Sequence, residues 1–585
     1  MVFLNRFKLY FCMDFKEQII SIIAKETSTS EELVRSLLTV PPIGMGDYAY
    51  PCFIVAKEQK KSPVLISSEL STKISASFIE KVESKGPYIN IFLAKTSVSN
   101  SVLASIFTGA AFETKLGSGK VMVEYSSPNT NKPLHVGHLR NNILGLAISN
   151  LLSSTGHDVI KANLVNDRGV HICKSMLAYK LWGNNRDPIK EGIKPDHFVG
   201  EMYVLFNDKL KENPLLEEDA QKMLLLWEQN DKETIELWKK MNNWALSGMK
   251  VTYNNFGTKF DNWFLESEMF HKGNKQALID EGLSKGVFQK EDNGAIAAIL
   301  EPELPNKVIV RGDGTSLYAT NDLMLTQLKF DEFKLDKAIW VVANEQDLYF
   351  KQLFAIFNKL GRTWAKNCFH LSYGYVTLPS GKMKSREGTV VDADDLLKEV
   401  EELSFEEISK RYPQLSDNEK KERARQIALG GIKFLLLKSD AKKDMVFDKA
   451  SALAFDGETG PYLQYTYARA KSILRKAEKD FSIKLSDLDN ANYSLLIHPK
   501  EKELIMELSK YSDVIKKCWE NLSLHPMCHL LLMIAEEFNS YYHEVSVLKA
   551  DNKEEIIARL ALVNATTLVL KKGLNLIDID AIEEM

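Results

Sequence analysis

The sequence lacks the cysteine patterns of a disulfide framework or a thiolate zinc site. None of its cysteines stands in a C-x-x-C pair, and the six are scattered along the chain: Cys12, Cys52, Cys173, Cys368, Cys518 and Cys528. Disulfide scaffolds are small, secreted and cysteine-dense, whereas reducing compartments keep thiols free. We therefore expect a cytoplasmic protein without disulfides.

Long apolar runs are also missing. No stretch approaches the roughly 20 apolar residues that span a bilayer, so the sequence predicts no membrane partner. Residues 1–12 mix Asn5, Arg6 and Lys8 with aromatic residues, which is unlike a signal peptide. Because the helical pattern begins after Met13, we expect residues 1–12 to be an extension upstream of the native start, without a fold of its own.

Glycine and proline are few, with 30 and 17 among 585 residues, while apolar residues make up 45% and charged residues 26%. This composition excludes collagen-like, low-complexity and disordered classes. The net charge of −4 excludes a uniformly basic protein that coats nucleic acid, so any RNA contact must come from local patches. At about 150 residues per domain, the length predicts a multidomain chain of three to four domains.

Neither a Walker A loop nor a G-x-G-x-x-G motif is present. Gly117-Ser118-Gly119-Lys120 lacks the upstream glycine, and Val121 follows it where Ser or Thr is needed. A phosphate site in this chain must therefore be built in another way.

Hydrophobic patterning divides the chain into parts of different class. Period-two and period-three-to-four patterns separate strands from helices. The expected parts are the extension at 1–12, a small α+β N-terminal domain at 13–115, an α/β domain at 116–392, a helical junction at 393–455 and an all-α C-terminal bundle at 456–585.

The α/β part begins with a short apolar strand at 121–125, a long amphipathic helix at 138–152 and a strand at 158–165. This order predicts a Rossmann-like fold with a parallel sheet. Charged helical segments then suggest a helical insertion at about 183–306. Further strands are expected at 307–311, 338–343 and 373–376, and none beyond about residue 392.

Two histidines bracket a glycine at the predicted junction from strand to helix: His135-Val136-Gly137-His138. The free N–H groups and the dipole of a helix N-terminus attract phosphate, and glycine permits close approach of a nucleotide. The plainer alternatives are two solvated or helix-capping histidines. A two-histidine metal site would need a third ligand, and none stands nearby in the sequence.

A second segment is basic and bounded by glycines: Gly381-Lys382-Met383-Lys384-Ser385-Arg386-Glu387-Gly388. Cations on such a loop can offset the charge that builds up as pyrophosphate leaves. A short basic loop on its own is usually only solvated.

Together the two segments resemble the paired signatures of class I aminoacyl-tRNA synthetases, and the surrounding residues narrow the resemblance to the arginyl-tRNA synthetases. The similarity extends over essentially the whole chain from Met13. It includes the segments 46–53, 124–145, 166–179, 341–347, 383–396 and 460–476.

The resemblance implies an ATP-dependent ligase that forms arginyl-adenylate, releases pyrophosphate, and transfers arginine to the terminal adenosine of tRNA(Arg) with release of AMP. His135 and His138 would then bind the ATP phosphates, with Gly137 beside the nucleotide. Magnesium would accompany ATP, and no tightly bound cofactor is expected. Similar enzymes need bound tRNA before they activate arginine, and they are generally monomers.

The basic loop departs from the K-M-S-K-S pattern of the class. The slot of the second catalytic lysine holds Ser385, beside Lys382 and Met383. In the arginyl enzymes a lysine just before the histidine signature is thought to substitute for it, and here that is Lys132. Lys384 and Arg386 remain open as alternatives.

The guanidinium of arginine calls for carboxylates that accept two parallel N–H bonds. At family-matching positions the resemblance assigns this role to Glu124 and Asp322, with Tyr318 on the same helical face as Asp322. Asn129 and Gln346 would hold the α-amino and carboxylate ends. The family's histidine three residues after Gln346 is Tyr349 here, which leaves the role of that position open.

In the helical domain Tyr462, Tyr465 and Arg469 recur on one face, and aromatics beside cations can stack bases and neutralise phosphates. In similar enzymes this is the anticodon-binding domain, although a family histidine is Tyr467 here. Without the resemblance, such a stripe is more often core.

Other tRNA contacts are less marked. The N-terminal part resembles the module that arginyl enzymes use against the tRNA elbow, where Lys57, Lys60 and Lys61 can meet phosphates. The insertion carries no motif for hydrolytic proofreading, so we expect no editing activity.

The acidic run 392–395 resembles a magnesium site, but it precedes Leu396 and Leu397, so we expect it to begin a helix and to bind no metal. Two other functions stay open. One is a nucleotidyltransferase of the wider histidine-signature superfamily, and the other is a catalytically silent tRNA-binding relative.

Overall fold

The computed structural model describes residues 15–585 except 43, 273, 313–317, 378–390, 455–456, 489–490 and 551. The predicted extension at 1–12 lies outside the described residues. So do the basic-loop residues Lys382, Met383, Lys384, Ser385 and Arg386. Within the described part of the chain, every helix is too short or too polar to cross a membrane.

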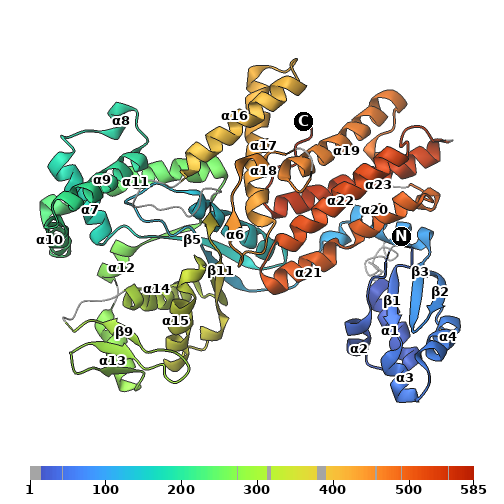
Figure 1. The fold of residues 1–585 in the computed structure, drawn as a ribbon, viewed down its shortest axis with the longest axis horizontal. Helices are drawn as coiled ribbons and strands as arrows, with labels where there is room; N and C mark the ends of the chain where they lie inside the picture. The colour runs from blue at the N-terminus through green and yellow to red at the C-terminus, as the bar shows by residue number, and fades with distance from the viewer. Residues whose placement is uncertain are drawn as a thin grey trace, which may run out of the picture.

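A small α+β domain begins the described chain, as the sequence predicts (Figure 1). Its antiparallel sheet has the order β1-β3-β2, and buried Ile89, Ile91 and Leu93 of β3 face its helices. The elements are α1 Phe15–Thr27, α2 Glu31–Leu37, β1 Tyr48–Pro51, α3 Phe53–Gln59, α4 Pro63–Lys73, β2 Ile79–Lys85, β3 Tyr88–Leu93 and α5 Lys95–Phe107.

A five-stranded parallel sheet of the order β11-β10-β4-β5-β6 lies at the centre of the molecule (Figure 1). Its strands are β4 Lys120–Glu124, β5 Asp158–Val165, β6 Asn262–Leu265, β10 Lys337–Ala343 and β11 Cys368–Tyr373. Central β4 is buried from Val121 to Glu124, as expected for a strand covered on both faces. Helix α6 (Val136–Ser154) connects β4 to its parallel neighbour β5, which confirms the predicted strand-helix-strand unit.

The region at about 183–306 is not the purely helical insertion that the sequence suggests. Strand β6 lies inside it and completes the parallel sheet, while β7 Phe288–Lys290 and β8 Ile296–Ala298 form a separate antiparallel sheet with β9 Lys307–Val310. The predicted strand at 307–311 therefore exists but belongs to a different sheet. These strands have three or four residues, too few for an alternating pattern to emerge from the sequence.

Among the described residues, seven helices lie between β5 and β7. They are α7 Val170–Trp182, α8 Pro188–Glu191, α9 Pro195–Glu212, α10 Leu216–Glu228, α11 Lys232–Phe256, α12 Glu266–Lys272 and α13 Lys275–Ser284. Helices α14 Tyr318–Phe333 and α15 Asp347–Lys359 pack on the face of β10 that carries Ala338 and Trp340, opposite the face that packs with α6. In Figure 1 the green helices α7 to α11 form a lobe beside the carboxyl end of the sheet.

The last third is a helical bundle, as predicted, with one exception. Strand β13 (Met445–Val446) pairs in parallel with β12 (Val376–Thr377), so strands do not end at residue 392. Both have only two residues, which no sequence pattern marks. The helices are α16 Ala393–Arg411, α17 Asp417–Leu437, α18 Lys449–Ala452, α19 Gly460–Phe481, α20 Pro499–Ser509, α21 Tyr511–Asn521, α22 His525–Glu544 and α23 Lys553–Leu576.

The N-terminal domain docks on the helical bundle, although the two are distant in sequence (Figure 1). Lys502 of α20 donates to Asp47 at 2.8 Å and to the carbonyl of Leu93 at 3.1 Å, and Lys95 donates to the carbonyl of Ile497 at 3.1 Å. One hydrophobic core runs from this domain through α6 into the bundle. The sheet and both terminal domains are thus packed into one body.

A fully buried arginine ties α6 to distant parts of the chain. Arg140 donates to the carbonyl oxygens of Gly374 and Tyr375 at 2.7 and 3.2 Å, and to those of Ala441 and Lys443 at 3.1 and 2.8 Å. Its relative exposure is 0%. The guanidinium thus joins the first turns of α6 to the segments around β12 and β13.

Replacing Arg140 with methionine would leave these carbonyl groups buried without donors. We expect R140M to lose at least about 3 kcal/mol of unfolding free energy, because it loses hydrogen bonds to a charged group and leaves buried carbonyl oxygens unpaired. Urea unfolding followed by tryptophan fluorescence measures this. The matched control is R35A, which removes a surface ion pair to Glu17 and should leave the stability nearly unchanged. Equal effects of the two variants would contradict the role of Arg140.

Candidate active site

The amino end of α6 is closed by its own signature histidines. His135 is the N-cap residue, and its Nδ1 accepts from the backbone N–H of Gly137 at 3.1 Å. In return, Nδ1 of His138 accepts from the backbone N–H of His135 at 3.1 Å. The two rings lie 3.9 Å apart between centroids. This reciprocal arrangement is a capping box made of two imidazoles.

The capping bonds decide the tautomer of both rings. A neutral imidazole that accepts at Nδ1 carries its proton on Nε2. Burial lowers the pKa of His135 to about 3, and burial together with the neighbouring ring lowers the pKa of His138 well below its ordinary value. The charge of Lys132 adds to both shifts. Both histidines are therefore neutral near pH 7, and each offers an Nε2–H donor.

Gly137 makes room for this arrangement. A Cβ atom on Gly137 would lie 2.9 Å from Cε1 and 3.0 Å from Nδ1 of His135. Any other residue would push the His135 ring off its capping position. The sequence-based expectation that Gly137 admits a nucleotide stays a prediction.

The residues that follow the basic segment, from Val391 to Ala393, lie against the first turn of α6. The backbone N–H of Val136 donates to the carbonyl of Val391 at 3.1 Å, and that of Ala393 donates to the carbonyl of Leu134 at 3.0 Å. His135 and Asp392 form an antiparallel bridge between these bonds. Since Arg140 holds the residues before 378, the segments on both sides of the basic loop are anchored to α6.

Two predicted substrate carboxylates lie together beside the sheet. Glu124, at the end of β4, forms a buried ion pair with Lys329 of α14. Asp322, also on α14, accepts from the hydroxyl of Tyr349. Burial raises the pKa of Asp322 to about 6, with the negative charge of Glu124 adding to the shift and the Tyr349 bond opposing it. The two carboxylates therefore interact electrostatically.

The other predicted arginine contacts come from three separate segments. Tyr318 begins α14 one turn before Asp322, and its side chain is exposed. Asn129 bridges to Asn166 in the loop after β4, and Gln346 ends the short 3-10 helix after β10. Both are exposed and follow the carboxyl ends of neighbouring strands, where ligands bind in open α/β sheets.

Two residues near the carboxylates, Lys329 and Glu266, were not anticipated for the site, while Tyr349, whose role the sequence left open, contacts Asp322. Glu266 of α12 is buried, its Oε2 has no hydrogen-bond partner among the described residues, and burial raises its pKa to about 7. Its charge acts on both Tyr318 and Tyr349. Lys329 could have been found from the sequence, because it stands seven residues after Asp322 and so lies on the same face of the helix. No sequence pattern marks Glu266.

An acidic turn lies next to the histidine signature. As predicted, Asp392 caps α16, accepting from the N–H groups of Asp394 and Asp395 at 2.8 and 3.2 Å. Asp392, Asp394 and His197 are close enough to share a metal ion, but Nζ of Lys194 already lies 2.7 Å from Asp394. A lysine thus supplies positive charge to this cluster.

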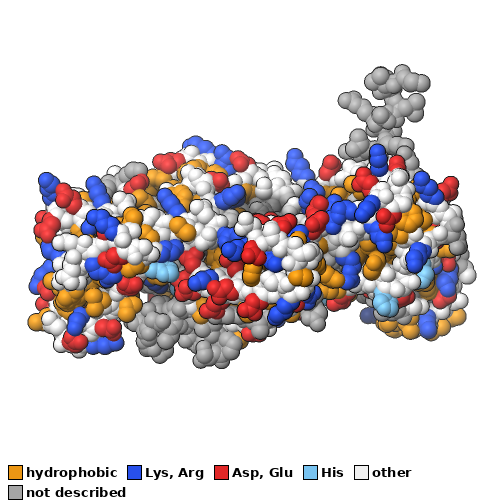
Figure 2. Space-filling view, turned by 90° about the horizontal axis from the view of Figure 1, so that it is seen from above, with side chains coloured by type: hydrophobic (Ala, Val, Ile, Leu, Met, Phe, Trp, Pro, Cys, Tyr) orange, Lys and Arg blue, Asp and Glu red, His pale blue; other side chains and the backbone are white. Residues whose placement is uncertain are grey.

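A groove in the bundle contains two of the three predicted tRNA residues. The cavity has a volume of about 830 Å³ and is lined by Tyr465 and Arg469, with Arg423, Arg475 and Lys476. Arg469 donates to the hydroxyl of Tyr465 at 2.7 Å and stacks over its ring at 4.6 Å. Figure 2 shows Lys and Arg side chains among acidic ones over the bundle.

Tyr462 and Tyr467 are placed differently. The hydroxyl of Tyr462 accepts from Asn539 at 3.0 Å, inside the bundle. Tyr467, which stands where similar enzymes have a histidine, is 2% exposed and belongs to the core. In the N-terminal domain Lys57 and Lys60 are exposed, and Lys61 pairs with Glu69 at 2.7 Å.

Comparison with known proteins identifies the family. Residues 102–449 match the catalytic-domain model described as "tRNA synthetases class I (R)", residues 463–585 match the DALR anticodon binding domain, and residues 13–93 match the arginyl tRNA synthetase N-terminal domain. The arginine–tRNA ligase of Treponema denticola is 42% identical over 562 residues, 94% of each chain. The chain belongs to the arginyl-tRNA synthetases.

Further comparisons agree with this assignment. The arginine–tRNA ligase of Borreliella afzelii is 40% identical to this synthetase over 560 residues, which is 94% of each chain. The structure of the Thermus thermophilus arginyl-tRNA synthetase matches with a TM-score of 0.77 at 27% identity, covering 97% of this chain and all of the other. The predicted family and the three-part architecture are confirmed.

The ion pair of Lys329 gives a direct test of the pocket. K329M would leave the Glu124 carboxylate buried without its partner, and we expect a loss of about 3–5 kcal/mol of unfolding free energy. The double variant E124Q/K329M should recover most of it, because no uncompensated charge remains. Urea unfolding of the four members of this cycle measures the coupling, and additive effects would contradict a direct pairing.

Proposed function

We propose that the α6 capping box and the Glu124–Asp322 carboxylates form the two halves of an active site that joins arginine to ATP. The synthetase attaches L-arginine to tRNA(Arg) in two steps, through arginyl-adenylate and release of pyrophosphate, followed by transfer to the terminal adenosine and release of AMP. The observation that carries the residue assignment is the pair of Nε2–H donors held at the end of α6. They are oriented by bonds to the protein before any substrate arrives.

The first step needs positioning and charge stabilisation more than acid or base catalysis. The carboxylate of arginine is already ionised and attacks the α-phosphorus in line, while the bond to pyrophosphate breaks. Donors on His135 and His138 and the ammonium groups of Lys132 and Lys382 offset the growing negative charge. Magnesium enters with ATP as part of the substrate.

Lys132 is the proposed replacement for the missing second signature lysine. Its charge lowers the pKa of both histidines, which places it next to them. Burial lowers the pKa of Lys132 itself, so its charge is poorly solvated until a phosphate arrives. Lys384 and Arg386, with Met383 and Ser385 of the same loop, stay as the alternative ATP contacts.

The arginine pocket is matched to its substrate by charge. Glu124, Asp322 and Lys329 together carry one net negative charge when all are ionised, and ionised Glu266 adds to it, so the pocket attracts a guanidinium. The carboxylate of Asp322 is the group we assign to the guanidinium fork, with Glu124 and Tyr318 beside it. Asn129 and Gln346 are assigned to the α-amino and carboxylate ends.

For tRNA we propose the groove of the bundle as the anticodon site. Tyr465 and Arg469 offer a stacking surface beside cations. Tyr462 would act through Asn539, which also accepts from Arg469 at 2.5 Å. The absence of editing, a monomeric state and a cytoplasmic location stay predictions.

Aminoacylation with labelled arginine tests the function and its alternatives together. We expect charging of tRNA(Arg) that depends on ATP, and exchange of pyrophosphate into ATP only when tRNA is present. H138A should lower the rate of exchange by about 10²–10³-fold, as loss of a transition-state donor does. A nucleotidyltransferase or a silent tRNA-binding relative would not charge arginine, and robust exchange without RNA would contradict the tRNA requirement.

The pH dependence of arginine binding tests Asp322. Because its pKa is raised to about 6, the carboxyl is protonated in the free enzyme below that pH and cannot bind the guanidinium as an anion. The KM for arginine should therefore rise as pH falls through 6, by about tenfold per unit, while the KM for ATP changes little.

Two variants serve as controls for this profile. Y349F removes the bond that lowers the pKa of Asp322, so the rise in KM should begin at a higher pH. D322N should have a raised KM without the pH-dependent limb. A wild-type KM for arginine that stays flat from pH 5 to 8 would rule out Asp322 as the guanidinium partner.

A further inference from the structure

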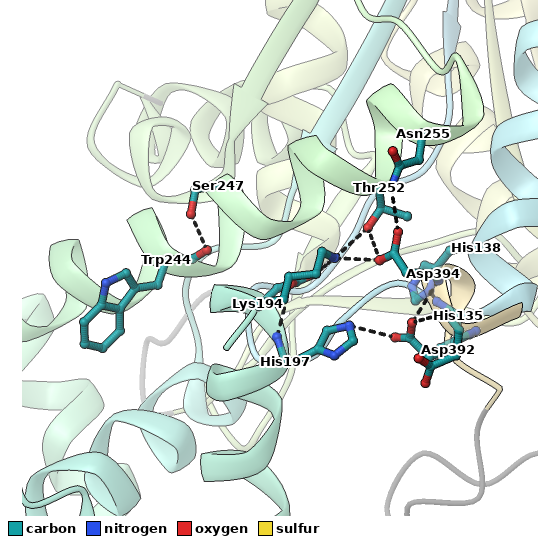
Figure 3. Close-up of polar contacts among 12 residues, drawn as sticks. His135, His138, Lys194, His197, Trp244, Ser247, Thr252, Asn255, Asp392 and Asp394 are labelled. Atoms are coloured by element: carbon teal, nitrogen blue, oxygen red, sulfur yellow. Dashed lines mark hydrogen bonds and ion pairs between the residues drawn. The ribbon is translucent and has the colours of Figure 1, made fainter. Parts of the chain in front are cut away.

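The helices α7 to α11 form an inserted lobe, and two of them, α9 and α11, contact the turn at Asp392–Asp394. This turn pairs with the histidine signature at the start of α6. Figure 3 shows α9 and α11 beside His135, His138 and the start of α16. Lys194, at the N-cap of α9, is the centre of the contact. Its Nζ lies 2.8 Å from Oδ2 of Asp196, 2.7 Å from Oγ1 of Thr252 and 2.7 Å from Oδ2 of Asp394.

Asp394 is held from α11 as well. Oγ1 of Thr252 donates to Oδ2 of Asp394 at 2.7 Å, and Nδ2 of Asn255 donates to Oδ1 at 3.1 Å. Both oxygens of this carboxylate are therefore bound by groups of the inserted lobe. Since Asp394 lies in the first turn of α16, the lobe fixes that turn.

A second pair joins α9 to the same turn. Nε2 of His197 lies 3.2 Å from Oδ2 of Asp392 (Figure 3). This pairing with Asp392 is the main reason why the pKa of His197 is raised. The backbone of Asp392 bridges His135. One residue thus connects α9, the cap of α16 and the cap of α6.

Close packing supports these polar contacts. A Cβ atom on Gly200 of α9 would lie 2.7 Å from Cδ of Pro133 and 3.8 Å from Cα of Lys132. The backbone of α9 is therefore in direct contact with the loop that carries Lys132. A shift of α9 would move this loop and the Asp392 turn together.

The charges explain why Lys194 and His197 matter. The carboxylates of Asp196, Asp392 and Asp394 meet within a largely buried region, with side-chain exposures of 0%, 13% and 20%. Without a cation between them, like charges in a poorly solvated site repel. Lys194 forms ion pairs with Asp196 and Asp394, and protonated His197 pairs with Asp392.

We propose that Lys194 and His197 are positioning residues for adenylate formation, holding the Asp392–Asp394 turn and, through it, the His135 cap of α6. This inference rests on the proposed function. Both residues contact the Asp392–Asp394 turn, and we place their effect on the reaction in His135 and the Lys132 loop.

The test compares K194M and H197Q with the wild-type enzyme in pyrophosphate exchange with tRNA present. We expect each to lower kcat by about 10–100-fold, the effect of misplacing a catalytic group by roughly 1 Å, with the KM for arginine within about twofold. K222M is the matched control, because Lys222 is an exposed lysine of the same lobe paired with Asp219; it should have wild-type kcat.

A pH profile separates positioning from simple damage to the fold. The charged groups around His197 are Asp392 on the facing turn and Asp196 and Lys194 on its own helix. Its ion pair is complete below the ordinary histidine pKa and is lost as pH rises through the raised pKa. The kcat of the wild-type enzyme should therefore decrease as pH rises through the raised pKa of His197. The kcat of H197Q should not show this decrease.

Conservative variants distinguish a loss of positioning from misfolding. K194R, which keeps the charge, should recover most of the kcat lost in K194M, and T252V should give a smaller loss of kcat than K194M. Wild-type kcat in both K194M and H197Q would overturn the inference, as would restoration of K194M by added Mg²⁺ alone, since that would make the cluster a metal site. Failure of the wild-type enzyme to charge arginine would instead refute the proposed function.

Discussion

The structure depends on how two imidazoles close the first turn of α6. Each ring uses Nδ1 to accept a backbone N–H, which leaves Nε2–H as a donor at the end of the helix. A carboxylate cap would satisfy the same backbone groups but would repel phosphate. Neutral histidine is suited to both tasks, and burial keeps it neutral until an anion arrives.

Much of the surrounding architecture restrains that turn. Arg140 ties α6 to the residues before the basic loop, and Val391 and Ala393 tie the residues after it to the signature. On the far side, α9 packs on the loop of Lys132. Segments separated by more than 200 residues thus converge on one helix end, which explains how two short sequence motifs far apart in the chain form one site.

The sequence predicted the strand at 158–165, helix α6 and the α-helical last third because each has a long and regular hydrophobic pattern. It did not reveal β6 or β13, since strands of four and two residues form only through their tertiary neighbours. Glu124 and Asp322 could be assigned by resemblance. Their partners could not, because a lysine or tyrosine on a helix is usually solvated, and only the folded chain shows Lys329 and Tyr349 turned inward.

The most direct measurement is a crystal structure of the enzyme with a non-hydrolysable arginyl-adenylate analogue. We expect the group that replaces the phosphate to accept hydrogen bonds from Nε2 of His135 or His138, and the guanidinium to contact the carboxylate of Asp322 beside the Glu124–Lys329 pair. A guanidinium bound away from Asp322, or an analogue whose phosphate mimic lies apart from the end of α6, would contradict it.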